Sequence, residues 1–161
     1  NLYGFKICNV PRLLCASKAY LAKHGMPKHP QDLASHNGLL YQLNDITYDV
    51  WEFYRGDELL KIKMKGNRIS NDGELVHRWC VSGKGIGLKS CLDISSDLLN
   101  GNVVHVLPEY QTKPTELWLI FPSRQSITPA ARLLRDTLKD KTRNILLQLI
   151  DKGILDKSVL D

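Results

Sequence analysis

The stretch KIKMKGNRISNDGELVHRWCVSGKGIGLKSC, residues 61–91, decides the fold class. Its opening, Lys61–Lys65, alternates polar and apolar residues, which is the period of a strand with one exposed and one packed face. Apolar residues then recur at helical spacing over residues 75–80, and Gly83 is placed to end that helix. Gly85–Leu88 is typical of a short buried strand. Strand, helix and strand within about thirty residues form a βαβ unit, which predicts a parallel sheet with a right-handed crossover.

The start of the predicted helix carries a capping signal. Asn71 followed by Glu74 fits a capping box, in which the two residues satisfy each other's backbone N–H groups. Asp72 would lie in the first turn, where the helix dipole is positive. We therefore expect Asn71 to be the N-cap.

Composition predicts an ordinary soluble globular protein. The chain has 161 residues, of which 43% are hydrophobic and 24% charged, enough for one domain or two small lobes. No apolar run approaches the roughly 18 residues that a membrane-spanning helix needs. The first residues do not have the layout of a signal peptide. We expect no membrane partner.

The cysteines and charges exclude several kinds of site. The four cysteines form no C-x-x-C pair and no zinc-type spacing with the five histidines, so no metal is expected. They are predicted to be reduced thiols of a cytosolic protein, with a redox-sensing pair as the alternative. The net charge of +5 favours nucleic acid or anionic ligands, although the basic residues are scattered and most suit solvated faces.

The remaining elements are predicted from local patterns. Residues 1–11 show no period and are expected to form an incoming connection, after which residues 12–16 form a strand. Ser17 is placed to cap a helix over Lys18–Lys23. Val50–Tyr54 and the strand around Ile62 are expected to form a hairpin.

The C-terminal part is predicted to contain one strand and two helices. Thr115–Phe121 is a near-continuous apolar run, which predicts a strand buried on both faces. Thr128 followed by Pro129 predicts a helix start. A second helix is expected through Ile145–Ile150, ending at Gly153.

No strong catalytic signature is present. The glycines of residues 83–87 lie between a helix and a following strand, whereas a dinucleotide fingerprint or a P-loop opens a helix. There is no G-x-S-x-G and no H-E-x-x-H motif, and the histidines are dispersed. We expect no enzymatic activity and no cofactor.

Ligands of an open parallel sheet bind outside the carboxyl ends of its strands. That rule selects six residues that follow predicted strands: Ser17, Ser70, Asn71, Asp72, Lys89 and Ser90. If the strands are parallel, all six face one edge beside a helix N-terminus, which suits a small anion. The alternative is that Ser17 and Asn71 act only as helix caps. The same rule places Lys84 at the opposite edge.

Short motifs that occur in a fixed order resemble a known family. They are RLLCAS at 12–17, HPxDL at 29–33, WxF at 51–53, NDGE at 71–74, GxGI at 83–86, LPEY at 107–110 and FP at 121–122. The ordered set, over about residues 13–138, resembles the effector-binding domain of LysR-type transcriptional regulators.

The resemblance implies an α/β, type 2 periplasmic-binding-protein-like fold, in which two subdomains close on a small effector. Residues 1–12 would be an incoming remnant of the first subdomain, and residues 13–114 the complete second subdomain. Residues 115–161 would supply the return strand and C-terminal helices of the first. The helix-turn-helix and the opening half of the first subdomain are expected to be missing from this sequence.

The implied function is effector sensing in a bacterial, cytoplasmic regulator. A small molecule in the cleft between subdomains would control transcription through an N-terminal DNA-binding helix-turn-helix outside this chain, commonly in a homo-oligomer. Lys18 replaces the family's usual proline, which puts the local turn in doubt. Lys89 and Ser90 replace an apolar residue and a proline, which suggests a negatively charged effector. The alternatives are a solute-binding protein of a transporter and a small α/β enzyme.

Overall fold

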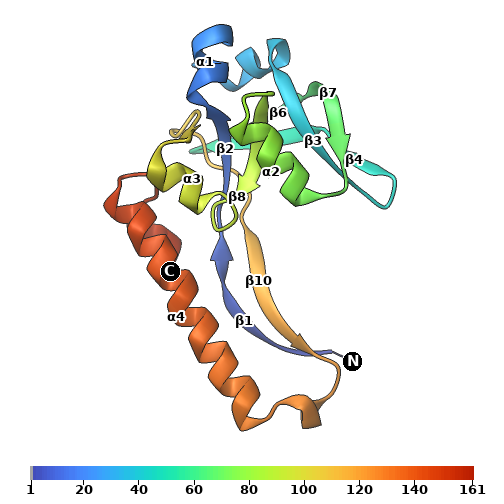
Figure 1. The fold of residues 1–161 in the computed structure, drawn as a ribbon, viewed down its shortest axis with the longest axis vertical. Coiled ribbons are helices and arrows are strands. Elements are labelled where there is room, and N and C mark those ends of the chain that lie inside the picture. Colours follow the sequence, from blue (N-terminus) through green and yellow to red (C-terminus); the bar gives the residue numbers. More distant parts are fainter. Residues whose placement is uncertain (1) are drawn as a thin grey trace. The chain divides into compact units, whose positions relative to one another are not determined.

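The computed structural model describes residues 2–161 and shows two compact units (Figure 1). One unit is Arg12–Lys113. The other joins the described residues before Arg12 to Pro114–Asp161. Each unit has its own sheet: among the described residues, every strand pairs with strands of its own unit.

A six-stranded mixed sheet forms the centre of the larger unit. The strand order is β4-β3-β8-β2-β9, with β7 also paired to β3. The bounds are β2 Arg12–Ser17, β3 Asn37–Leu43, β4 Ile46–Tyr48, β7 Lys65–Ser70, β8 Ile86–Ser90 and β9 Val103–His105. β7 and β8 run parallel to β3, whereas β2 runs antiparallel to both β8 and β9.

The predicted βαβ unit exists, but its first strand was predicted in the wrong place. α2 (Gly73–Val81) links β7 to β8, and β7 begins only at Lys65. The alternation of Lys61–Lys65 belongs mainly to β6 (Glu58–Lys63), which pairs with β5 (Val50–Arg55) in the predicted hairpin. β7 gave no local signal because its sequence, KGNRIS, has one large apolar residue, and that residue is exposed.

The core of the larger unit joins the sheet, the hairpin and α1 (Lys18–His24). Leu14 of β2, Ile86 of β8 and Phe53 of β5 belong to one cluster of buried apolar side chains. As predicted, the Ser17 hydroxyl caps α1 by accepting a hydrogen bond from the backbone N–H of Tyr20 at 3.1 Å. A 3₁₀ helix, Pro30–Ser35, and α3, Ser95–Asn100, complete the unit.

The smaller unit contains a two-stranded antiparallel sheet of β1 (Tyr3–Val10) and β10 (Thr115–Phe121). Residues 1–11 were expected to be an incoming connection without a clear period. The described part of that connection contains the strand β1, which the sequence pattern did not reveal because β1 gains its order from pairing with a strand about a hundred positions away. The expected burial of β10 on both faces was also wrong. Trp118 and Ile120 are 46% and 49% exposed.

The predicted pair of C-terminal helices is a single 23-residue helix, α4 (Pro129–Asp151). Its start was predicted correctly, since the Thr128 hydroxyl accepts a hydrogen bond from the Ala131 N–H at 3.1 Å. No glycine or proline interrupts the helix after its first residue, and Gly153, at φ 76°, follows its end. Short 3₁₀ turns at Arg124–Ser126 and Lys157–Leu160 flank it. Within residues 2–161, no helix is long and apolar enough to cross a membrane.

Candidate functional site

A cavity of about 490 Å³ lies in the larger unit, at the edge of the sheet where its parallel strands end. Its lining comes from the sheet, the hairpin, the start of α2 and both ends of the unit: Arg12, Leu39, Tyr41, Leu43, Tyr48, Val50, Trp51, Glu52, Gly73, Val76, Leu88, Lys89, Ser90, Asp93 and Lys113. We call it the sheet-edge cavity. Its volume falls in the range of small-ligand sites.

The sheet topology brings these residues together. β3 and β8 are parallel, so Tyr41 of β3 and Lys89 of β8 lie toward the same edge. β2 runs the other way, and its first residue, Arg12, pairs with Ser90, the last residue of β8. The start of one strand and the end of its neighbour thus meet at the cavity.

Lys89 is the most buried cation of this lining, with 9% of its surface exposed. Its Nζ donates a hydrogen bond of 3.0 Å to the carbonyl oxygen of Gly73, the first residue of α2. A helix N-terminus carries partial positive charge, which repels the Lys89 ammonium and attracts an anion; in α2 the Asp72 cap and Glu74 in the first turn offset part of that charge. No carboxylate of residues 2–161 forms an ion pair with Lys89. This corner of the cavity therefore suits a negatively charged group.

Arg12 supplies a second cation. Its Nε donates to the carbonyl oxygen of Lys113 at 3.2 Å, which orients the guanidinium. Burial lowers the pKa of Arg12 below its usual value, and the nearby Glu52 carboxylate opposes only part of this effect. Arginine nevertheless stays protonated at neutral pH. Glu52 is engaged elsewhere, by Lys61 Nζ at 3.6 Å and by the Tyr54 hydroxyl at 3.4 Å. The guanidinium of Arg12 is therefore not neutralised by a close ion pair.

Aromatic side chains give the cavity an apolar wall. The rings of Tyr41 and Tyr48 stack with centroids 6.2 Å apart. Trp51 is buried and its indole N–H donates to the Tyr48 carbonyl oxygen at 3.3 Å, which fixes the start of β5 against β4. A site with cations beside a flat apolar surface can bind the acid group of a small organic anion with the cations and its carbon skeleton with the apolar surface.

Two of the six residues selected from the sequence line the cavity. Lys89 and Ser90 are the last residues of β8, and their placement follows from the rule that selected them. Neither needs a catalytic motif to be recognised, because the position at the strand end is itself the signal.

Three selected residues, Ser70, Asn71 and Asp72, lie directly before α2, and two of them make the hydrogen bonds that start this helix. The expected N-cap, Asn71, was wrong by one position: the helix is capped by Asp72, whose Oδ1 accepts the Glu74 N–H at 3.0 Å. The Ser70 hydroxyl accepts the Asp72 N–H at 3.0 Å. Asn71 is exposed, and these three residues are not part of the cavity lining.

The expectation that Ser17 shares this edge was wrong. It assumed that the strand before Ser17 is parallel to the others, whereas β2 is antiparallel to β8. Ser17 therefore lies at the opposite end of the sheet. There its hydroxyl caps α1 and lies next to Gly83. Its role in the structure is the alternative foreseen from the sequence, that of a helix cap.

Sequence reasoning missed Arg12 and the aromatic wall. The available signal for Arg12 was its position at the first residue of a strand, which becomes informative only when the strand direction is known. Among residues 2–161, no group of three or more His, Cys, Asp or Glu side chains is arranged to hold a metal ion.

A model of the LysR substrate binding domain family matches residues 1–143. The HTH-type transcriptional regulator DmlR of Escherichia coli K12 is 37% identical over 139 residues, covering 86% of this chain and 45% of DmlR. The activator TtdR of the same strain is 38% identical over 110 residues, covering 68% of this chain and 35% of TtdR. The chain thus spans less than half the length of these relatives.

Solved regulatory domains have the same fold. The regulatory domain of CrgA, a LysR-type transcriptional regulator from Neisseria meningitidis, matches with a TM-score of 0.73 and 25% identity, covering 86% of this chain and 68% of CrgA's. The regulatory domain of AphB from Vibrio vulnificus matches with a TM-score of 0.68 and 25% identity, over 85% and 67% of the two chains.

These matches favour a transcription regulator over the transporter protein and the enzyme that the sequence left as alternatives. They confirm the α/β, type 2 periplasmic-binding-protein-like fold implied by the sequence motifs. The chain belongs to the LysR substrate-binding domain family, the effector-binding and non-enzymatic part of LysR-type transcriptional regulators.

Proposed function

We propose that this chain senses a small anionic effector in the sheet-edge cavity. The observation that carries the proposal is Lys89, whose buried ammonium lies at the N-terminus of α2 without a carboxylate partner among the described residues. Burying a charge is costly unless it is paired, so a bound carboxylate would stabilise this unit. Arg12 adds a second cation, and Tyr41 and Tyr48 suit the carbon skeleton of the ligand.

The sensing domain acts, in this proposal, within a longer bacterial regulator. The family supports an N-terminal helix-turn-helix that binds DNA, assembly into a homo-oligomer, and a cytoplasmic location. We assign the Arg12–Lys113 unit to the second subdomain and the remainder of the chain to the first.

Effector binding would act by a population shift. A ligand changes the balance between two conformations only by its difference in affinity for them, and each tenfold difference contributes about 1.4 kcal/mol. An anion favours the conformation in which Lys89 is shielded from water, because there the ion pair is strongest. Conformations that hydrate Lys89 gain less from the same anion.

The test is a thermal-unfolding and calorimetry screen with small carboxylates, phosphate and sulfonates against amines of similar size. Carboxylates should raise the melting temperature of the native chain. At a ligand concentration one hundred times Kd, binding increases the free energy of unfolding by about 2.7 kcal/mol. Lys89→Met should abolish the shift. Arg12→Gln should weaken it.

Lys84→Met is the matched control, since Lys84 is exposed and is not part of the lining. It removes the same charge and should leave binding unchanged. If no anion of the panel binds the native chain, or if the Lys89 and Lys84 variants bind equally, the proposal is wrong.

A further inference from the structure

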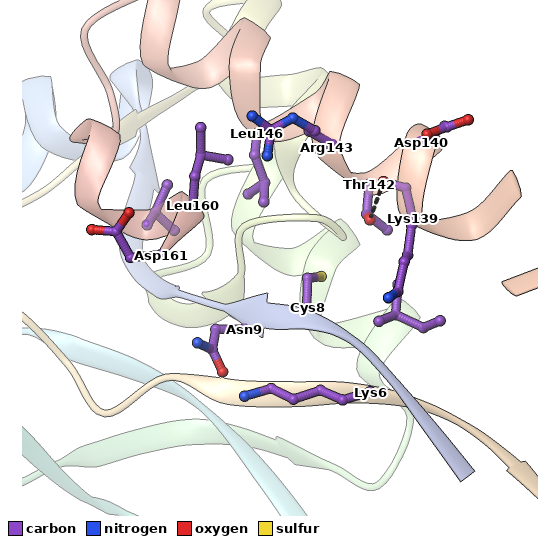
Figure 2. A pocket seen from close by; sticks show the side chains of 12 residues that line it. Lys6, Cys8, Asn9, Lys139, Asp140, Thr142, Arg143, Leu146, Leu160 and Asp161 are labelled. Carbon is purple, nitrogen blue, oxygen red and sulfur yellow. Dashed lines mark hydrogen bonds between the residues drawn. The ribbon is translucent and has the colours of Figure 1, made fainter. Parts of the chain in front are cut away.

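A second cavity, of about 340 Å³, lies within the smaller unit (Figure 2). Its lining comes from β1, α4 and the C-terminal segment: Lys6, Ile7, Cys8, Asn9, Lys139, Asp140, Thr142, Arg143, Leu146, Val159, Leu160 and Asp161. We call it the Cys8 pocket. Leu146 and the segment Val159–Asp161 lie outside the residues that match the family model, residues 1–143.

The helical repeat explains the α4 wall. Lys139, Arg143 and Leu146 recur at intervals of four and three residues, which places them on one face of the helix. In Figure 2 the Lys139 side chain runs from α4 toward β1, and the Cys8 sulfur points toward α4. Leu146 and Ile7 are buried, which gives the pocket an apolar floor.

Three cations and two carboxylates line the pocket: Lys6, Lys139 and Arg143, and Asp140 and Asp161. Lys139 and Arg143 form no ion pair with any residue that the structure describes. Lys6 pairs with Glu116 at 3.0 Å, but both side chains are well exposed, and such pairs neutralise little charge. In Figure 2 the Asp140 carboxylate lies on the far side of α4 from Cys8, and Asp161 lies near Leu160, away from Lys139. The Lys139 ammonium is therefore the charge beside Cys8 that neither carboxylate opposes closely.

We propose that the Cys8 pocket binds a small amphipathic anion, namely a carboxylate or sulfonate with a short hydrocarbon body. Lys139, which extends toward β1 beside Cys8, binds the acid group, and Arg143, which extends along α4 beside Leu146, adds positive charge to the pocket. Ile7, Leu146 and Leu160 surround the hydrocarbon. The volume suits a ligand of this size. This site is separate from the sheet-edge cavity in its lining residues and does not depend on the function proposed there.

Cys8 supplies a direct readout. It is partly exposed, whereas Cys15, Cys80 and Cys91 are 0% exposed, so a thiol reagent should modify Cys8 first. The experiment follows this modification by mass spectrometry, with the anionic disulfide reagent dithiobis(nitrobenzoate) and with a neutral dithiodipyridine, in the presence and absence of octanoate. Octanoate should slow both reactions in a saturable manner, and octylamine should not.

The decisive variant is Lys139→Gln with Arg143→Gln. It should lose the protection by octanoate, and its ratio of anionic to neutral reagent rates should fall about tenfold as two nearby positive charges disappear. Lys141→Gln with Lys152→Gln is the matched control: it removes the same charge from exposed positions outside the lining and should behave as the native chain. Lys89→Met should also retain the protection.

Three results would overturn the proposal: no protection of native Cys8 by octanoate, equal protection by octylamine, or equal loss in the two double variants. The first two use only the native chain, so the test stands even if the decisive variant does not fold.

Discussion

Replacing Lys89 by methionine should make the ligand-free chain more stable while it abolishes anion binding. Methionine keeps the apolar stem of lysine and removes the ammonium. In the fold that ammonium is buried beside the positive end of α2 and is held by one carbonyl oxygen, that of Gly73. A residue kept for ligand binding often costs stability, and the sign of this change therefore separates a binding role from a structural one.

The magnitude follows from three opposing contributions. The lost hydrogen bond to Gly73 costs about 1.5–3 kcal/mol, because its donor is charged. Relief of the repulsion by the α2 dipole returns about 0.3–1 kcal/mol. Relief of the desolvation of the buried charge is larger, of the order of several kcal/mol before relaxation. We expect a net gain of roughly 1 kcal/mol, the low end of the gain seen when buried ion pairs are replaced by apolar side chains.

The assay is urea unfolding followed by circular dichroism, in a chloride buffer without carboxylates or phosphate. With a denaturant slope of about 2 kcal/mol per molar urea, the Lys89→Met midpoint should rise by about 0.5 M. Lys84→Met should stay within about 0.5 kcal/mol of the native chain, as expected for an exposed position. A fall of the Lys89→Met midpoint by 0.5 M or so would refute the reasoning, because the ammonium would then stabilise the fold without a ligand.

Ser17→Ala should lower the free energy of unfolding by about 1 kcal/mol through loss of the α1 cap, yet leave carboxylate binding by calorimetry unchanged; weaker binding would contradict the assigned strand direction. Phe53→Ala should cost about 3–5 kcal/mol in urea unfolding, since Phe53 is 1% exposed in the core, and a cost below about 1 kcal/mol would place it outside that core. Burial lowers the pKa of both His36 and His105, so the fold favours their neutral forms. The stability they contribute is complete above their unfolded pKa of about 6.5 and is lost as pH falls through the lowered folded pKa values. His36→Asn with His105→Asn should therefore show a flatter dependence of the urea midpoint on pH below about 6.5, and an unchanged slope would count against these shifts.

Local patterns were sufficient where structure is set by neighbours in sequence. The spacing of apolar residues over 75–80 predicted α2, and Gly85–Leu88 predicted most of β8. The end of β8 in turn placed Lys89 and Ser90 in the sheet-edge cavity. In each case the physical cause, a helical face or a buried strand, leaves its period in the sequence.

Strand direction and pairing partner leave no such trace. Ser17 was expected at the wrong end of the sheet because β2 obtains its direction from pairing with β8 and β9. Arg12 was missed for the same reason, although it lies only five positions earlier. The exposed strand over Lys65–Ser70 was missed because partner strands, rather than its own apolar residues, hold it in place.

The register of β8 places its last two residues on opposite faces of the sheet. Lys89 reaches Gly73 of α2 on one face. The Ser90 side chain lies on the other face, together with Leu88, which packs against the core around the hairpin. Arg12, directly opposite Ser90 on β2, lies on that same face. Both residues line one cavity because the sheet ends there.

An anion in that cavity would therefore contact both layers of the unit, and its binding should depend on the position of the ammonium rather than on net charge. Exchanging the two residues, Lys89→Ser with Ser90→Lys, keeps composition and charge but moves the ammonium away from α2. We expect carboxylate binding measured by calorimetry to fall at least tenfold, about 1.4 kcal/mol, with Lys84→Ser and Ser82→Lys as the exchange control at exposed positions outside the lining. Native affinity in the exchanged variant would mean that the general positive field of the cavity, and not the Lys89 corner at the helix N-terminus, attracts the anion.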